Sequence, residues 1–197
     1  MFIVFEGLDG CWKTTQIELL KKNLNKNGIY NVMDFREPGS TELGEEIRVM
    51  LLYNELTDIQ RLFLFLASRN IVTNKEIIPA IENGDIVICD RYTPSTLAYQ
   101  GYGKKVADIG LIHRMNNLAC ENVHPDLVIF LDVPVEECLK RQDEYDEMEK
   151  SSISAYENIY NGYKQLAKNI NWVTVDGTKS IDEISKEIFD IVKSKLW

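Results

Sequence analysis

A glycine-rich turn close to the N-terminus has the residue types needed to bind phosphate. From Gly7 to Thr14 the chain matches the phosphate-loop pattern GxxxxGK[ST] at every fixed position but one. In such a loop, backbone N–H groups and a helix N-terminus surround phosphate oxygens, the lysine contacts the terminal phosphates and the hydroxyl ligates Mg²⁺. The residues predicted to hold a triphosphate are Gly7, Gly10, Cys11, Trp12, Lys13, Thr14 and Thr15. An ordinary strand-to-helix turn is the alternative.

Trp12 is the residue that departs from this pattern, because it stands where the second glycine belongs. If that position requires a positive φ, a side chain there costs about 1–2 kcal/mol. The indole also takes up volume beside the phosphates. Two interpretations stay open: an active enzyme whose loop has adapted to tryptophan, and a chain that keeps its acceptor site but has lost efficient transfer.

Charged residues stand at the carboxyl ends of two further predicted strands. Arg36 follows the predicted strand 31–35, and Asp90 and Arg91 follow the predicted strand 86–89. Open α/β sheets bind ligands at this edge. Arg36 is therefore predicted to clamp a substrate phosphate, Asp90 to hold hydrated Mg²⁺ together with Thr14, and Arg91 to stabilise a transferring phosphoryl group. A structural salt bridge between such residues is the alternative.

A stripe of one predicted helix and a polar turn after Arg91 could bind a nucleoside. Arg61, Phe65 and Arg69 recur every fourth residue, so a ring that stacks on a base lies one turn from a guanidinium that could hydrogen-bond its edge. Ordinary core packing is the alternative for this helix alone. Hydroxyl and amide groups suited to a nucleoside are those of Ser95, Thr96, Tyr99 and Gln100.

Five short runs rich in strand-forming residues must position these residues. They lie at 2–5, 31–35, 86–89, 127–131 and 172–175, and helical segments are predicted between them at 15–27, 41–52, 58–83, 106–122, 153–170 and 181–195. The first run is continuously apolar, as expected when helices cover both faces of a parallel sheet. The pattern predicts an α/β fold with a five-stranded parallel sheet in a single domain, 1–197.

Composition narrows the class of protein. The 197 residues carry a formal charge of −9, which disfavours nonspecific binding to nucleic acid or to an anionic membrane. Any anionic ligand therefore needs a local basic cluster. The four cysteines form no CxxC pair, and the N-terminal apolar run is too short for a signal peptide or a membrane span. We expect reduced thiols and a cytoplasmic location.

The chain resembles the bacterial thymidylate (dTMP) kinase family over essentially its whole length. The matching segments are FEGLDGCWKTTQ at 5–16, FREPGST at 35–41, LFLASR at 64–69, DRYTPSTLAYQG at 90–101 and PDLVIFLDVPVE at 125–136. The resemblance implies a P-loop kinase fold and ATP-dependent phosphorylation of dTMP with Mg²⁺. It also implies a homodimer built on apolar helices such as 59–66.

The resemblance assigns roles to individual residues. It places Asp9 and Arg36 around the monophosphate, Phe65 on the pyrimidine face and Arg69 at the pyrimidine edge. It has Tyr99 crowd the 2′ position of the sugar. The residues implied to serve transfer itself are Asp9, Lys13 and Arg91, and those implied to contact ATP outside the phosphate loop are Arg141 and Asp176.

Both departures from the family pattern fall on the donor side. Besides Trp12, the expected lid at about 141–152 is short, and its first ten residues hold five acids against two bases. Glu147 stands where the family often has an arginine. Two alternatives to a dTMP kinase therefore remain: a catalytically weakened nucleotide-binding homologue that keeps monophosphate recognition, and a kinase for a modified pyrimidine nucleotide.

Overall fold

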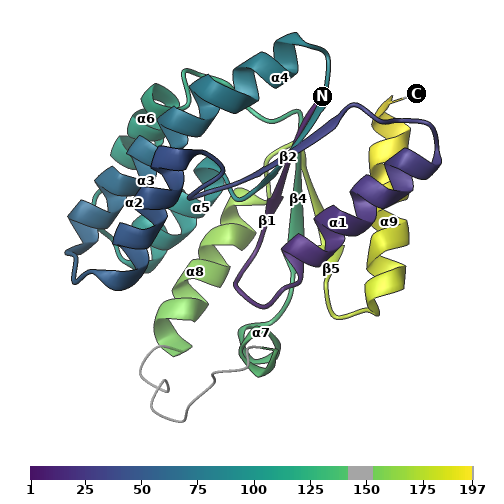
Figure 1. Ribbon diagram of the computed structural model, residues 1–197. Helices are drawn as coiled ribbons and strands as arrows, with labels where there is room; N and C mark the ends of the chain where they lie inside the picture. The colour runs from purple at the N-terminus through teal and green to yellow at the C-terminus, as the bar shows by residue number, and fades with distance from the viewer. Residues whose placement is uncertain (142–152, 197) are drawn as a thin grey trace.

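The strands of the computed structural model, which describes residues 1–141 and 153–196, form one parallel sheet. They are β1 Phe2–Glu6, β2 Val32–Arg36, β3 Ile86–Asp90, β4 Leu127–Asp132 and β5 Trp172–Asp176. Their order in the sheet is β2-β3-β1-β4-β5, and every neighbouring pair is parallel. The predicted five-stranded parallel sheet is confirmed (Figure 1).

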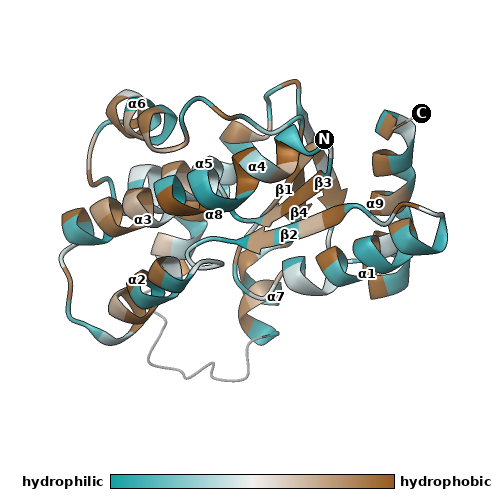
Figure 2. Ribbon diagram, turned by 45° about the horizontal axis from the view of Figure 1, so that its top comes forward, coloured by the Kyte–Doolittle hydropathy of each residue, from teal (hydrophilic) through white to brown (hydrophobic). Residues whose placement is uncertain are grey.

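Helices cover both faces of this sheet, also as predicted. They are α1 Lys13–Lys26, α2 Glu42–Tyr53, α3 Asp58–Val72, α4 Ile78–Glu82, α5 Thr93–Thr96, α6 Ile109–Ala119, α7 Val135–Lys140, α8 Ile153–Leu166 and α9 Ile181–Leu196, with π-helical segments η1 Thr73–Ile77 and η2 Leu97–Gly103. Figures 1 and 2 show α1 and α9 side by side, away from α3, α4 and α6.

The position of the central strand β1 between two cores explains why its residues are continuously apolar. Ile3 and Phe5 pack into the core that α1 and α9 cover, whereas Phe2 and Val4 pack into the core formed with the end of α3 and with α4. All four side chains are almost fully buried. A strand with a core on each face has no position for a solvated side chain, which is why its apolar residues do not alternate with polar ones.

Each strand ends in a charged residue, and these residues lie at the carboxyl edge of the sheet. The last residues of β1 to β5 are Glu6, Arg36, Asp90, Asp132 and Asp176. The register pairs Arg36 with Asp90 and Asp132 with Asp176. The sheet therefore assembles a polar edge from segments far apart in the sequence, next to the loop between β1 and α1.

Several predicted element bounds differ from the structure. The predicted helix 106–122 is α6, Ile109–Ala119, because Asp108 caps it by accepting from the Leu111 N–H and because Glu121 and Asn122 have positive φ. The segment predicted as 153–170 ends at Leu166. Of the predicted lid, only Arg141 lies among the described residues. No described helix is long and apolar enough to cross a membrane.

Shortening a side chain in β1 tests where the core lies. Ile3 has no exposed surface, so Ile3→Ala leaves a cavity and should lower the free energy of unfolding by about 2–5 kcal/mol. The matched control is Ile170→Ala, because Ile170 is 104% exposed and its loss should change stability by less than about 0.5 kcal/mol. Urea unfolding of both variants checks this. Equal losses would contradict the described core.

Candidate active site

The loop between β1 and α1 has the backbone that the phosphate-loop pattern requires. Trp12 has φ 68° and ψ 26°, so it adopts the left-handed conformation, which is unfavourable for a residue that has a Cβ. Gly7 has φ 146°, and a Cβ there would lie 2.7 Å from the Cys11 Sγ and 2.9 Å from the Leu131 carbonyl oxygen. Glycine is therefore required at position 7 for both conformation and space.

Lys13 and Thr14 follow at the start of α1 and point into the loop and toward β3. The Lys13 ammonium donates to the carbonyl oxygens of Gly7 and Leu8 at 3.1 and 2.9 Å. The Thr14 hydroxyl donates to Asp90 Oδ2 at 3.0 Å, while Asp90 Oδ1 is buried with no hydrogen-bond partner among the described residues. A hydroxyl beside an unpartnered carboxylate oxygen is a donor set that fits Mg²⁺.

Trp12 and Arg141 stack on one another across the donor side. The Arg141 guanidinium carbon lies 3.6 Å from the centre of the indole ring. Arg141 also donates from Nε to Glu137 at 3.1 Å and from Nη1 to the Gly177 carbonyl at 3.1 Å. The structure thereby joins the phosphate loop to the loop that follows Asp176, the two places where the sequence predicts contacts with ATP.

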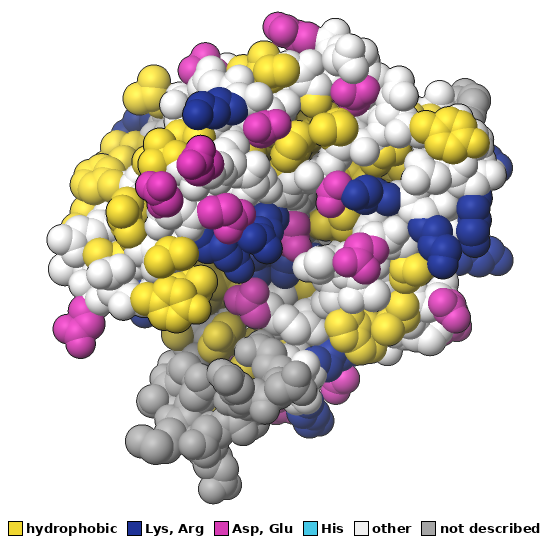
Figure 3. All heavy atoms as spheres, in the orientation of Figure 1, with side chains coloured by type: hydrophobic (Ala, Val, Ile, Leu, Met, Phe, Trp, Pro, Cys, Tyr) yellow, Lys and Arg dark blue, Asp and Glu magenta, His cyan; other side chains and the backbone are white. Residues whose placement is uncertain are grey.

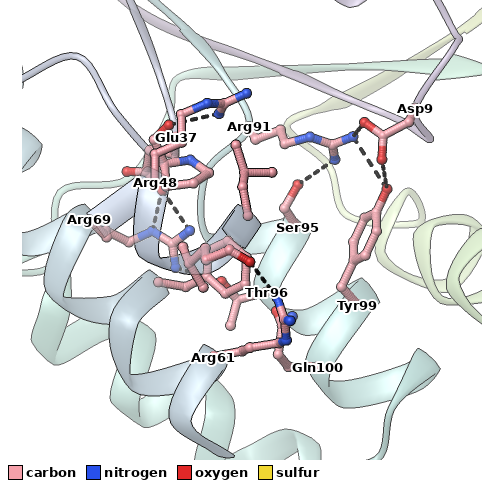
Figure 4. Close-up of a pocket in the computed structure, with 14 residues that line it drawn as sticks. Asp9, Glu37, Arg48, Arg61, Arg69, Arg91, Ser95, Thr96, Tyr99 and Gln100 are labelled. Carbon is pink, nitrogen blue, oxygen red and sulfur yellow. Dashed lines mark hydrogen bonds and ion pairs between the residues drawn. The ribbon is translucent and has the colours of Figure 1, made fainter. Parts of the chain in front are cut away.

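Arg91 is the centre of a second cluster, on the acceptor side. Its Nη2 donates to Asp9 at 2.8 Å, and its Nη1 donates to Ser95 and Tyr163 at 3.0 and 3.1 Å. The Tyr99 hydroxyl donates to the other Asp9 oxygen at 3.2 Å (Figure 4). The charge of Arg91 lowers the pKa of Asp9 to about 2, so this carboxylate is ionised at neutral pH.

Glu6 is a site residue that the sequence reasoning missed. This fully buried carboxylate accepts from the Tyr92 and Ser95 backbone N–H groups at 2.9 and 3.2 Å. It also accepts from the Ser95 and Tyr163 hydroxyls at 2.7 and 2.9 Å. Both hydroxyls in turn accept from Arg91, so Glu6 orients the groups that hold Arg91. A glutamate within an apolar strand, directly before the phosphate loop, is the signal that could have indicated it.

Arg69 is 2% exposed, and every N–H of its guanidinium has a partner within the protein. Nε and Nη2 both contact Glu37 Oε2, at 2.8 and 2.6 Å. The remaining N–H groups donate to Thr96, Asn116 and the Tyr92 carbonyl. Its predicted contact with a pyrimidine edge therefore requires exchange of one of these partners. Burial raises the pKa of Glu37 to about 7, against the lowering effect of the Arg69 charge.

Two cavities open at the carboxyl edge of the sheet. The first, of about 250 Å³, is lined by Asp9, Glu37, Pro38, Arg48, Leu51, Leu52, Arg61, Phe65, Arg69, Arg91, Ser95, Thr96, Tyr99 and Gln100 (Figure 4). The second, of about 660 Å³, is lined by Asp9, Gly10, Trp12, Lys13, Thr14, Thr15, Ile17, Asp34, Phe35, Arg36, Glu37, Ser40, Glu45, Arg48, Asp90 and Arg91. Figure 3 shows Lys and Arg side chains gathered in the hollow centre of this face, with acidic side chains around them.

The cavities separate the predicted residues into two groups. Every residue predicted to bind the acceptor lines the first cavity except Arg36, which lines the second. The Arg36 guanidinium forms two hydrogen bonds with the Glu45 carboxylate, at 3.0 and 2.9 Å. Most of the predicted donor residues line the second cavity. Those that line neither are Gly7, Cys11, Arg141 and Asp176.

Comparison with known proteins decides the family. The sequence model of the family described as thymidylate kinase matches residues 5–188. The chain belongs to the thymidylate kinase family. The thymidylate kinase of Fervidobacterium nodosum is 41% identical over 199 residues, which cover 100% of each chain. That of a Thermoanaerobacter species is 38% identical over 201 residues, covering 99% of this chain and 98% of the relative.

A solved thymidylate kinase also shares this fold. The crystal structure of the enzyme from Ehrlichia chaffeensis superposes with a TM-score of 0.80 at 34% identity, covering 98% of both chains. The predicted family and the predicted P-loop kinase fold are therefore confirmed. The chain is a thymidylate kinase-type phosphotransferase in which a tryptophan replaces a phosphate-loop glycine.

Removing the buried guanidinium of this kinase should destabilise its fold. Arg69→Ala leaves the Glu37 carboxylate buried without its partner, so we expect a loss of about 3–5 kcal/mol in the free energy of unfolding at pH 7. Because the Glu37 pKa is about 7 beside Arg69 and rises further without that charge, parent and variant differ in protonation only above pH 7, and the deficit should grow as the pH rises from 7 toward 9.

The control for this change lies on the same helix. Arg61 donates to a single backbone carbonyl, that of Leu51, at 2.7 Å, and pairs with no described carboxylate. Arg61→Ala should therefore cost less than about 1.5 kcal/mol at either pH. Urea unfolding of both variants at pH 7 and pH 9 is the measurement. A deficit of Arg69→Ala that is small, or that does not depend on pH, would contradict the buried pair.

Proposed function

We propose that this chain transfers the terminal phosphoryl group of ATP to dTMP across the junction of the two cavities. The observation that carries the proposal is that the cavities share Asp9, Glu37, Arg48 and Arg91. A nucleoside monophosphate in the first cavity would place its phosphate at this junction, opposite a triphosphate in the second. Membership in the thymidylate kinase family supports this reaction.

The first cavity offers what a thymine nucleoside needs. Phe65 provides a ring face for stacking, and Tyr99 provides bulk against the sugar. The Gln100 side chain, largely buried, makes no hydrogen bond with any described residue. A carboxamide both donates and accepts, so it matches the neighbouring carbonyl and N–H of thymine. We assign Gln100 to the base edge, with Ser95 and Thr96 beside the nucleoside and Arg69 behind it.

The second cavity suits the donor and its metal ion. Backbone N–H groups from Gly10 to Thr15 would surround the phosphates, and Lys13 would exchange its two carbonyl partners for phosphate oxygens. Thr14 and Asp90 would hold Mg²⁺, which when bound neutralises charge on the donor phosphates. Arg141 and the loop after Asp176 would contact the rest of the nucleotide.

Transfer in this arrangement needs positioning and charge neutralisation. The attacking phosphate oxygen of dTMP is already anionic, so no general base is required. Arg91, fixed by Asp9, presents positive charge at the junction where charge moves from donor to acceptor. Lys13 does the same from the donor side. Asp9 therefore acts by orienting Arg91, and its ionised state at neutral pH suits this role.

A homodimer is the assembly that we propose. Large apolar side chains are exposed on α2 and at the start of α3, among them Leu43, Val49, Met50, Leu52, Tyr53, Ile59 and Phe63. A monomeric protein seldom exposes so many large apolar side chains together to water. The four cysteines are free and buried, which agrees with the expected reduced thiols, and the cytoplasmic location stays a prediction.

The reaction is tested by a coupled ATPase assay with purified protein. We expect ADP release that depends on dTMP and Mg²⁺ and that is slower with dCMP or UMP. Lys13→Ala should abolish transfer, because its role is on the donor phosphates, and should leave the Kd for dTMP unchanged in calorimetry. Transfer to no pyrimidine monophosphate would overturn the proposal. Loss of dTMP binding in Lys13→Ala would instead show that Lys13 contacts the acceptor phosphate.

Trp12→Gly tests what the tryptophan does to the donor site. The Trp12 side chain lines the second cavity, where it takes up volume beside the phosphates, so the glycine variant should bind ATP about tenfold tighter or more and transfer faster. Its affinity for dTMP should not change. Stability should change little, since relief of about 1–2 kcal/mol of strain opposes the loss of about 0.5–2 kcal/mol of stacking on Arg141.

The control is Trp12→Phe, which keeps an aromatic ring and the left-handed backbone. It should bind ATP as the parent chain does. If Trp12→Gly binds ATP no better than the parent chain, the loop has adapted to tryptophan. A gain in transfer of several orders of magnitude would instead make the parent chain a weakened homologue.

A further inference from the structure

We propose that this chain recognises its phosphoryl donor through the triphosphate rather than through the base, so that ATP, GTP, CTP and UTP bind about equally well. Trp12 is the residue that removes selection for the base, because its indole covers a face of Arg141. The proposal rests on the proposed function, since it names the class of donor for the same second cavity. It follows from the stack of Trp12 on Arg141, from the loop after Asp176 and from the lining of the cavity.

The stack of Trp12 on Arg141 is the first argument. A guanidinium recognises a base through its flat face and its N–H groups. The indole centre lies 3.6 Å from the Arg141 guanidinium carbon, and the Arg141 side chain is only 10% exposed. Nε and Nη1 donate to Glu137 and to the Gly177 carbonyl, whereas Nη2 has no hydrogen bond to a described residue. Nη2 can donate to a ribose hydroxyl or an α-phosphate oxygen, and every nucleoside triphosphate has both.

The loop after Asp176 is the second argument. The Gly177 N–H donates to the Asp132 carbonyl at 3.0 Å, and the Gly177 carbonyl accepts from Arg141. Asp176 Oδ1 accepts from the Thr178 N–H and hydroxyl at 3.0 and 2.6 Å. A site rejects the wrong base when that base leaves buried polar groups without a partner. The hydrogen-bonding side chains from 176 to 180 are all exposed, so water would replace a missing base.

The lining of the second cavity is the third argument. From the phosphate loop the cavity continues along β2 and toward the N-terminus of α2, where its lining residues are Asp34, Phe35, Arg36, Ser40 and Glu45. Arg141 and Asp176 do not line it. Of the residues on the side of Arg141, Trp12 is the one that lines the cavity. An indole stacks on any base, because every base has a π-face, so this contact does not select among donors.

The proposal is tested by calorimetry with Mg²⁺ and each of the four triphosphates, without dTMP. The Kd values of the parent chain should lie within about threefold of one another, because stacking on an indole tolerates every base. Trp12→Gly uncovers Arg141, so ATP and GTP, whose larger rings cover more of a guanidinium, should bind about threefold or more tighter than CTP and UTP. Trp12→Phe keeps a ring on Arg141 and is the matched control, without such a preference. Arg141→Ala should weaken all four donors by the same factor.

Each outcome bears on the proposal. A parent chain that binds ATP about tenfold or more tighter than CTP and UTP would overturn it, as would an Arg141→Ala variant that loses affinity for ATP alone. Equal binding of all four donors by Trp12→Gly would show that the indole does not remove the selection. If Trp12→Gly does not fold, the parent chain and Arg141→Ala decide. The proposed function fails separately, when no triphosphate transfers phosphate to dTMP, whatever the ratios of donor affinity.

Discussion

The guanidinium groups of Arg69, which is buried, and of Arg91, which is largely buried, are the constraint on which the site depends. A charge taken out of water is tolerated when a partner of opposite sign is held in good geometry. Arg69 meets this condition through Glu37, and Arg91 meets it through Asp9 and through hydroxyls that Glu6 orients. These partners come from different elements, so the folded core is what brings the charges together.

The same pairs explain how a chain of net charge −9 can bind two phosphorylated substrates. Carboxylates fix the arginines before any substrate arrives, so little reorganisation is needed when charge moves during transfer. Positive charge at the junction then comes from Arg91 and from Lys13. The parallel sheet makes this possible because its strands end at one edge, beside the phosphate loop.

Much of this arrangement follows from the sequence. Apolar runs and helical periodicity predicted the sheet, and the strand-end rule placed Arg36, Asp90 and Arg91 at one edge. Glu6 was missed because a single acid after an apolar run resembles an interruption of the strand. The full engagement of Arg69 could not be predicted, since Asn116 and Glu37 reach it from distant segments. Such contacts depend on tertiary packing, which residue spacing does not encode.

The central claim is that donor and acceptor phosphates meet where the two cavities join. A crystal structure with a bisubstrate analogue, thymidine and adenosine joined through five phosphates, tests it most directly. We predict the thymine against Phe65, the phosphate chain passing between Arg91 and the loop at Lys13, and the adenosine toward Arg141. A thymidine outside the first cavity, or a phosphate chain that avoids the shared residues, would contradict the account.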